Sequence, residues 1–149
     1  MTTDRNFKDD LETGLAWEAK YLDSIREKYP QAYRVEGKFK GYDIYVPETE
    51  MAIEVKYDAE SVNTGNIVIE VEMNGKPSGL TTTRADFWLV ATPHDYCYIS
   101  ASRLMRLILR HGIRQVEFTG PGDSSSKKAY LVKKDLIHRY AHKVYQGIS

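Results

Sequence analysis

The sequence predicts an α/β protein in which a mixed β-sheet is flanked by helices. Three observations predict this class: a long amphipathic helical pattern opens the chain, six strand patterns follow as a group, and the remaining strands then mix with helices. Strands grouped in this way and then interleaved with helices are typical of a mixed sheet with helical layers. The 149 residues suffice for one core, so we expect a single domain over residues 1–149.

The first element is predicted as a helix over residues 5–29. Its apolar residues recur at steps of three, four or seven, as one helix face requires, and they are Phe7, Leu11, Leu15, Leu22, Ile25 and Tyr29. Pro30 ends this helix. The polar slot in the stripe is Glu18, one turn after Gly14, which would allow close approach to a sheet. Glu18 either points toward a site there, or lies at the edge of a stripe that Ala19 completes.

The middle of the chain carries strand patterns separated by turn residues. We expect a strand near 34–40, a hairpin within 41–58, and strands at 66–73, 86–93 and 96–100. Residues 75–86 are rich in Gly, Pro and Thr, which predicts a loop with room for one helical turn. Cys97 lies between tyrosines in the last of these strands and is predicted to be a buried thiol.

The C-terminal third predicts two helices and two strands. The first helix covers residues 100–112, with Ser100 as its N-cap and Gly112 just past its end. Strands at 115–119 and 129–134 flank a loop at 120–128, and a last helix covers 135–147 with Asp135 as its N-cap. This helix would place His138 and His142 one turn apart, where a solvated pair is favoured over a zinc site because no third ligand is near.

The hairpin register follows from its apolar pattern. A turn centred between Glu48 and Thr49 pairs Val46 with Met51 and Ile44 with Ile53. It gathers an apolar face on one side of the hairpin, made of Ile44, Val46, Met51, Ile53 and Val55. The other face carries Asp43, Glu54 and Lys56, with Asp43 directly opposite Glu54. Opposed Cβ atoms lie about 4.5–5.5 Å apart, so the two carboxylates repel unless a cation lies between them.

This acidic pair suits a hard divalent cation. Carboxylate oxygens are the ligands that Mg²⁺ or Mn²⁺ prefers, with room left for water and phosphate. The Lys56 ammonium, on the same face, could hold or help to deprotonate an attacking water and stabilise charge that develops on a phosphate. The alternative is a solvated strand face on which Asp43, Glu54 and Lys56 form surface ion pairs.

The sequence resembles the PD-(D/E)xK nuclease superfamily. The resemblance lies in Asp43, followed after ten residues by Glu54 and after one more residue by Lys56, and in the preceding helix that carries Glu18. That superfamily includes restriction enzymes, archaeal Holliday-junction resolvases and phage junction-resolving endonucleases. The resemblance covers residues 14–92, about half of the chain. Tyr42 precedes Asp43 where the motif has Pro, a departure that members of the superfamily often show.

The resemblance implies a restriction-endonuclease-like fold and metal-dependent hydrolysis of DNA phosphodiester bonds. It implies that Asp43, Glu54 and the backbone carbonyl of Val55 bind Mg²⁺ or Mn²⁺, and that Lys56 positions or activates the water. Glu18 would match the first-helix acid that some members use for metal or water. Glu70 is a further candidate, because the strand at 66–73 is expected beside that of Glu54. The alternative is that Glu70 and Glu72 are solvated strand residues.

Charge and loop composition indicate a polyanion-binding surface. Residues 1–100 carry 11 basic and 18 acidic side chains, a net charge of −7, whereas residues 101–149 carry 10 and 3, a net charge of +7. Candidate DNA-binding residues lie in the 75–86 loop and on one face of the 100–112 helix. They are Lys76, Ser78, Thr83, Arg84, Arg103, Arg106 and Arg110, and Arg114 continues the same spacing.

The remaining expectations concern function class and context. The single cysteine, the polar N-terminus and the lack of a run of about 20 apolar residues predict a protein of the reducing cytoplasm, in a prokaryotic or phage-infected cell, with no membrane segment. Small size favours cleavage of branched DNA, and cutting two strands at matched positions favours a homodimer. The alternatives are a restriction or repair nuclease, and an inert nuclease-like module that binds DNA or protein.

Overall fold

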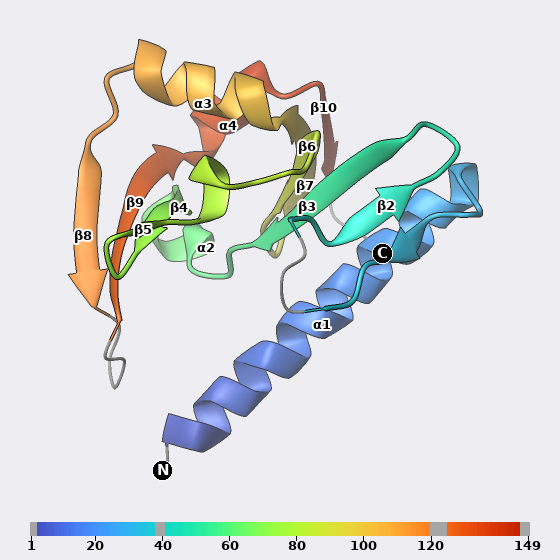
Figure 1. Ribbon diagram of the computed structural model, residues 1–149, viewed down its shortest axis with the longest axis horizontal. Helices are drawn as coiled ribbons and strands as arrows, with labels where there is room; N and C mark the ends of the chain where they lie inside the picture. The colour runs from blue at the N-terminus through green and yellow to red at the C-terminus, as the bar shows by residue number, and fades with distance from the viewer. Residues whose placement is uncertain (1–2, 38–40, 120–124, 147–149) are drawn as a thin grey trace.

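The computed structural model of the protein describes residues 3–37, 41–119 and 125–146, with side chains described from residue 16 onward. Over these residues it is an α/β protein with one mixed sheet and one antiparallel sheet (Figure 1). The six-stranded sheet contains, in spatial order, β1 (Tyr33–Arg34), β2 (Ile44–Val46), β3 (Met51–Tyr57), β6 (Phe87–Ala91), β7 (Asp95–Ser100) and β10 (Lys143–Gln146). The four-stranded sheet contains β5 (Lys76–Pro77), β4 (Asn66–Met73), β9 (Ser126–Lys133) and β8 (Gln115–Thr119).

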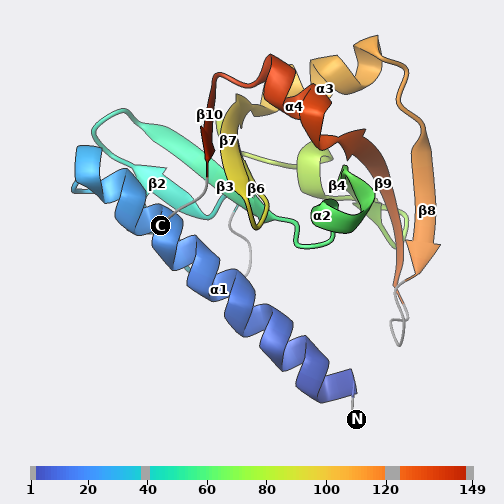
Figure 2. The ribbon, with the colours of Figure 1, turned by 180° about the vertical axis from the view of Figure 1, so that it is seen from behind.

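Four α-helices and one 3-10 turn complete the described part of the chain: α1 (Thr3–Lys28), α2 (Ser61–Thr64), α3 (Ala101–Arg110), α4 (Lys134–Tyr140) and η1 (Gly79–Thr81). The helix α1 runs beside β2 and β3, while α3 and α4 lie at the other end of the molecule, near the four-stranded sheet (Figure 2). Within the six-stranded sheet β3 and β6 are parallel and the other pairs are antiparallel. Parallel neighbours need a crossover connection, and residues 58–86, which include β4, supply it.

Two hydrophobic clusters form because the central strands alternate their side chains between the two faces of the six-stranded sheet. Phe87 and Leu89 face α1, in a cluster that includes Tyr21, Ile25 and Ile53. Trp88 and Val90 face the other way, toward β4, β9, α3 and α4, in a cluster that includes Ile67, Ile69, Leu104, Leu107, Val132 and Ile137. Both faces of β6 are therefore buried, as its continuous apolar sequence requires.

Several sequence-based predictions are confirmed. The first helix, the hairpin and the strand at 66–73 are present, and the 75–86 loop contains the one predicted helical turn. Ser100 is the N-cap of α3, because its side chain accepts a hydrogen bond from the Arg103 N–H at 3.2 Å. Cys97 is fully buried, and burial, followed by the charge of Asp95, raises the pKa of its thiol to about 12.

The last predicted helix is wrong in both of its ends. It begins at Lys134 rather than after an Asp135 cap, and it ends at Tyr140. The following residues form the edge strand β10, in which Tyr145 stacks on Tyr96 of β7 with ring centroids 4.8 Å apart. A β-branched valine and an aromatic residue in sequence favour a strand, and the open edge of β7 provides the partner. His142 consequently lies outside the helix, so the predicted helical histidine pair is not formed.

Three other expectations are corrected. The strand at 34–40 is limited to Tyr33–Arg34 in the described residues, and residues 38–40 lie outside them. The strand β4 does not pair beside Glu54, because β2 and β6 occupy the two edges of β3 and β4 pairs with β5 and β9 instead. Arg114 lies beyond the end of α3 and does not extend its arginine face.

Candidate functional site

The β2–β3 hairpin has the predicted register, with Val46 opposite Met51 and Ile44 opposite Ile53. Ile44, Val46 and Ile53 are buried as expected, Val55 is half-buried, and Met51 remains 37% exposed. Beyond Ile44 the ladder changes, because the carbonyl of Ile53, the ladder partner of Ile44, accepts a hydrogen bond from the Asp43 N–H at 2.9 Å. Two residues opposite one is the arrangement of a β-bulge. The predicted direct opposition of Asp43 and Glu54 is therefore replaced by an offset of one residue.

The Asp43 side chain completes the hydrogen bonding of β3. Its Oδ2 accepts a hydrogen bond from the Val55 N–H at 2.8 Å, so a carboxylate occupies the place of a backbone carbonyl on the neighbouring strand. Asp43 is 9% exposed, and a buried carboxylate needs such a donor. The hydrogen bond holds Asp43 against the peptide that links Glu54 to Val55, and hence close in register to both Glu54 and Lys56.

Glu54 and Lys56 lie on the face of the sheet that points away from α1. Glu54 pairs with Trp88 and Lys56 with Val90 across the parallel β3–β6 ladder, and these two partners belong to the cluster between the sheets. Both charged side chains are half-buried. They are therefore at the margin of an apolar core, where electrostatic interactions are stronger than at an open surface.

The loop after η1 borders the same region. The Arg84 N–H donates to the Gly41 carbonyl at 3.1 Å. A Cβ atom at position 41 would approach the Arg84 side chain to 2.6 Å, so the contact needs glycine. The Thr83 hydroxyl accepts hydrogen bonds from the Trp88 Nε1–H and the Ala85 N–H, both at 3.2 Å, which anchors the loop beside the partner of Glu54. Arg84 is exposed. Its partner Gly41 precedes Asp43 by two residues in the chain.

Glu18 lies on the other side of β3 from Glu54. It lies on α1, which packs on the opposite face of β3, and its Oε1 is 3.8 Å from the Arg34 Nε. Within the residues that the structure describes from 16 onward, no group of three or more His, Cys, Asp and Glu side chains could hold a metal ion. The three-carboxylate convergence that the helix pattern suggested is therefore not found.

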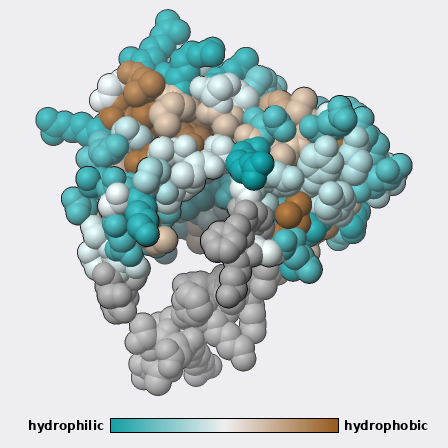
Figure 3. Space-filling view, viewed as in Figure 1, coloured by the Kyte–Doolittle hydropathy of each residue, from teal (hydrophilic) through white to brown (hydrophobic). Residues whose placement is uncertain are grey.

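The other predicted site residues are distributed over the second sheet and α3. Glu70 accepts a hydrogen bond from the Ser78 Oγ at 2.9 Å and lies 4.0 Å from the Lys127 Nζ, so its contacts are within the second sheet and its loop. Lys76 is exposed on β5. On α3, Arg106 and Arg110 are exposed, whereas Arg103 donates from Nη1 to the Tyr140 carbonyl at 3.1 Å and joins α3 to α4. Leu109 of α3 is 68% exposed. Figure 3 shows hydrophobic surface at the end of the molecule where α3 lies.

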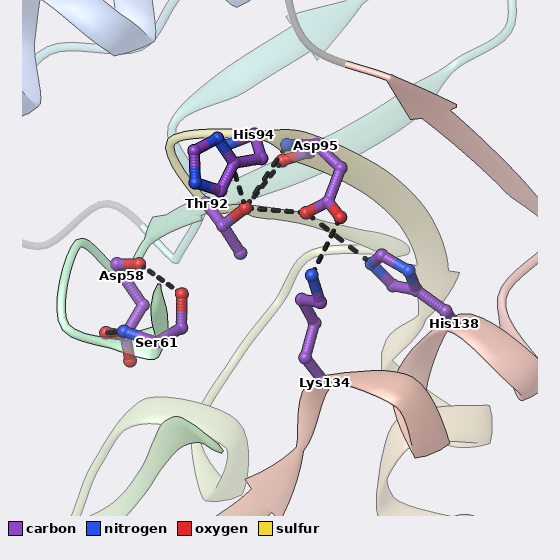
Figure 4. A network of polar contacts seen from close by, with 7 residues as sticks. All are labelled: Asp58, Ser61, Thr92, His94, Asp95, Lys134 and His138. Carbon is purple, nitrogen blue, oxygen red and sulfur yellow. Dashed lines mark hydrogen bonds and ion pairs between the residues drawn. The ribbon is translucent and has the colours of Figure 1, made fainter. Parts of the chain in front are cut away.

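Sequence reasoning missed a polar cluster around Asp95, the first residue of β7 (Figure 4). Asp95 is 7% exposed and accepts a hydrogen bond from the Thr92 hydroxyl at 2.6 Å and from the Lys134 Nζ at 2.9 Å. The His138 Nε2 lies 3.9 Å from its Oδ1. Thr92 and Asp95 are about 40 positions before Lys134 and His138 in the sequence. The one sequence signal is the apolar Ile137, which precedes His138 and is buried, and which indicates that this part of α4 faces the core.

The electrostatics of this cluster follow from burial and from its charges. Burial alone would raise the pKa of Asp95, but hydrogen bonds from Thr92 and Lys134, together with the nearby charges of His138 and Lys134, lower it. Burial lowers the pKa of His138, and the charge of Lys134 adds to this, against the opposing effect of Asp95 and Asp135. The neutral imidazole is therefore favoured in the folded protein.

Two further carboxylates act on strand amides as Asp43 does. The Asp58 Oδ2 accepts from the Val68 N–H of β4 at 3.1 Å, and its Oδ1 accepts from the Ser61 N–H at 3.2 Å. The Asp86 Oδ2 accepts from the Ala52 N–H of β3 at 2.8 Å. Hydrogen bonds of this kind are structural, and the buried Asp58 shows that a buried acid in this fold is not by itself a sign of catalysis.

No family model, curated protein or solved structure matches the chain. None of the described helices is long and apolar enough to cross a membrane. What the candidate site can do must therefore be argued from its own residues. Its distinguishing feature is that Asp43, Glu54 and Lys56 are close in register at the border of a core and beside an exposed arginine.

Replacing Asp43 separates its structural role from any role of its charge. Asp43→Ala leaves the Val55 N–H without its acceptor, and we expect it to lower the free energy of unfolding by about 1–3 kcal/mol. Asp43→Asn keeps an acceptor oxygen at nearly constant shape and should retain most of that stability. Chemical denaturation of the three proteins measures the difference. Equal loss of stability in both variants would contradict the assigned hydrogen bond.

His138 should make the protein less stable in mild acid. Its pKa in the folded protein is below that of the unfolded chain, so the unfolded chain takes up the proton first, and stability falls as the pH drops below about 6.5. His138→Gln should flatten this fall, by at most about 1.4 kcal/mol per pH unit for one proton. Denaturation of both proteins from neutral pH to pH about 5 tests it. His142, whose pKa burial also lowers, is present in both proteins and cancels in the comparison. An identical pH dependence in the two would contradict the prediction.

Proposed function

We propose that the protein is a metal-dependent endonuclease that hydrolyses phosphodiester bonds in DNA. The observation that carries this proposal is the hydrogen bond from the Val55 N–H to the Asp43 carboxylate, because it fixes an acid beside the Glu54-x-Lys56 segment. The parallel β3–β6 pair and the helix α1 on one face of the sheet are compatible with a restriction-endonuclease-like core, which is the finer fold that we propose.

The donors available to a cation support Mg²⁺ or Mn²⁺. The carboxylates of Asp43 and Glu54 and the carbonyl of Val55 offer hard oxygen ligands, and the hydrogen bond from the Val55 N–H holds Asp43 at the same segment of β3. Mg²⁺ is usually bound through one or two carboxylates, with water and substrate phosphate completing its shell. A set of two carboxylates without a third is therefore sufficient, and Glu18 and Glu70 are not needed as ligands. When bound, the ion would supply Lewis-acid activation of the phosphate and of the water.

Lys56 has the position required of a residue that acts on charge during the reaction. Its side chain lies on the same face of β3 as that of Glu54, and it is half-buried beside Val90. An ammonium there can donate to a water or to a phosphate oxygen, and its effect on developing negative charge is increased by the adjacent apolar core.

The DNA path is proposed over exposed basic residues of the 75–86 segment and of α3. Arg84 is exposed, and its N–H donates to the carbonyl of Gly41, two residues before Asp43. Lys76, Arg106 and Arg110 are exposed and can bind phosphates without base recognition. Ser78, Thr83 and Arg103 already bind Glu70, Trp88 and Tyr140, and we assign them to supporting the loop and α3. A homodimer acting on branched DNA is the form that we propose for paired cleavage.

A second candidate function is an inert module that binds DNA or protein. The same hydrogen bond favours it, because Asp43 performs a structural task that would persist without catalysis. Asp58 and Asp86 show that this fold uses carboxylates in that way elsewhere. The two functions differ in a simple observable: an inert module binds its partner without cleaving it in any divalent metal.

Cleavage assays with matched variants test the proposal. The purified protein should cut one or more of linear duplex, single-stranded, branched and four-way DNA in Mg²⁺ or Mn²⁺, and should be inactive in excess EDTA. Glu54→Gln should abolish cleavage, and Lys56→Met should reduce it by about 100-fold or more. Glu72→Gln, which alters a carboxylate paired with Lys128 in the other sheet at 3.1 Å, should leave cleavage unchanged and controls for a contaminating nuclease.

The pattern of outcomes separates the alternatives. Cleavage that survives in EDTA or in Glu54→Gln would contradict the metal site. Binding of DNA without cleavage in either metal would establish the inert module. The DNA form that is cut most rapidly decides between a junction-resolving nuclease and a restriction or repair nuclease. An RNA control shows whether cleavage is limited to DNA.

A further inference from the structure

A cleft of about 720 Å³ opens on the α1 side of the six-stranded sheet. It lies between the end of α1, the β2–β3 hairpin, and the strands β7 and β10. Its walls include Tyr29, Phe87, Tyr98, Tyr145, Lys28 and Lys143. Its volume is that of a small-molecule site, which typically measures about 300–1,000 Å³. Ile53 also lines it, so the cleft and Glu54 lie on opposite faces of β3.

Three tyrosines of the cleft, Tyr96, Tyr98 and Tyr145, contact one another through their rings. Tyr145 stacks on Tyr96 at 4.8 Å and an interplanar angle of 10°, and Tyr98 meets Tyr145 edge to face at 6.0 Å and 83°. Tyr29, Phe87, Tyr98 and Tyr145 are each half-buried, so each has a side that packs on the protein and a side that does not. Fixed, partly exposed rings are the surfaces on which nucleobases stack, because every base has a flat π-face.

The charges at the cleft complement a phosphate. Lys28, at the end of α1, and Lys143, at the start of β10, bring two ammonium groups from elements far apart in sequence. Lys28 lies 5.4 Å from the Tyr29 ring centroid and Lys143 lies 5.1 Å from that of Tyr145, so each cation accompanies an aromatic ring. Glu27 is the acidic side chain among the described lining residues, which leaves a net charge of +1.

We propose that this cleft binds a nucleobase that carries a phosphate. The base stacks on the aromatic wall, and the phosphate lies at Lys28 and Lys143. A free nucleotide and an unpaired nucleotide of a single strand share this chemistry. The proposal does not depend on the nuclease function, because the cleft is on the face of β3 opposite Glu54 and Lys56, and it can be tested without divalent metal.

Calorimetric titration in EDTA tests the proposal and distinguishes the two sources. The ligands are adenosine monophosphate, adenosine, inorganic phosphate and a short oligodeoxythymidylate. We expect binding of the monophosphate or the oligonucleotide, with adenosine and phosphate each weaker, because each offers only half of the contacts. Binding of the oligonucleotide alone assigns the cleft to single strands, whereas binding of the monophosphate assigns it to free nucleotides.

Variants of the wall and rim locate the binding. Lys143→Gln should weaken binding of the phosphate-bearing ligand and leave the affinity for adenosine unchanged. Tyr145→Leu should weaken binding of the phosphate-bearing ligand about tenfold or more. Lys28→Gln provides a second rim variant if the change at Tyr145 disturbs folding. The control is Lys133→Gln, an exposed lysine of β9 that does not line the cleft. The proposal would be overturned if none of the four ligands binds, or if the Lys143→Gln and Lys133→Gln variants bind the phosphate-bearing ligand with equal affinity.

Discussion

The arrangement of the candidate site depends on one hydrogen bond, from the Val55 N–H to the Asp43 carboxylate. The strand β2 has three residues and β3 has seven, so the shorter strand runs out of carbonyls before the amides of β3 are satisfied. A buried amide without an acceptor costs about 1–3 kcal/mol. The Asp43 side chain replaces the missing carbonyl, and this fixes where Asp43 lies relative to Glu54 and Lys56.

The alternation of β3 then divides the molecule between two faces. Ile53 and Val55 point to α1 and the aromatic cleft, while Glu54 and Lys56 point to the side of Trp88 and Val90. A one-residue slip of β3 would exchange these faces and place the charged residues under α1. Asp86 opposes such a slip from the other edge, because it binds the Ala52 N–H at 2.8 Å. The two proposed activities are thus separated by the same register that positions the acids.

The sequence predicts the parts of this fold that have strong local patterns. The hairpin register follows from apolar alternation, the first helix from its stripe, and the start of α3 from the Ser100 cap. The bulge at Asp43 is not predictable in this way, since a side-chain oxygen that replaces a carbonyl leaves no mark in a hydropathy pattern. The sheet to which β4 belongs is also hidden, because periodicity identifies a strand but not its partner. Asp95, Lys134 and His138 meet only through tertiary packing.

Glu18 illustrates the same limit within the candidate site. A polar residue in an apolar stripe indicated a functional direction, but it does not indicate the face of the sheet on which the helix packs. The structure places α1 opposite Glu54 and gives Glu18 the guanidinium of Arg34 at 3.8 Å. Two carboxylates and a carbonyl remain as candidate ligands, a set that Mg²⁺ or Mn²⁺ tolerates because water and phosphate complete its coordination.

Paramagnetic broadening of backbone amide signals by Mn²⁺ tests this account most directly. The Val55 and Val68 amides are matched, since each is held by a buried aspartate, Asp43 and Asp58 respectively, and Val55 lies between Glu54 and Lys56 in β3 whereas Val68 belongs to β4. The account predicts that substoichiometric Mn²⁺ selectively broadens the amide signals of Val55 and its neighbours and leaves the Val68 signal sharp. The broadening at Val55 should disappear in Glu54→Gln. Broadening that is equal at both amides, or absent at Val55, would contradict it.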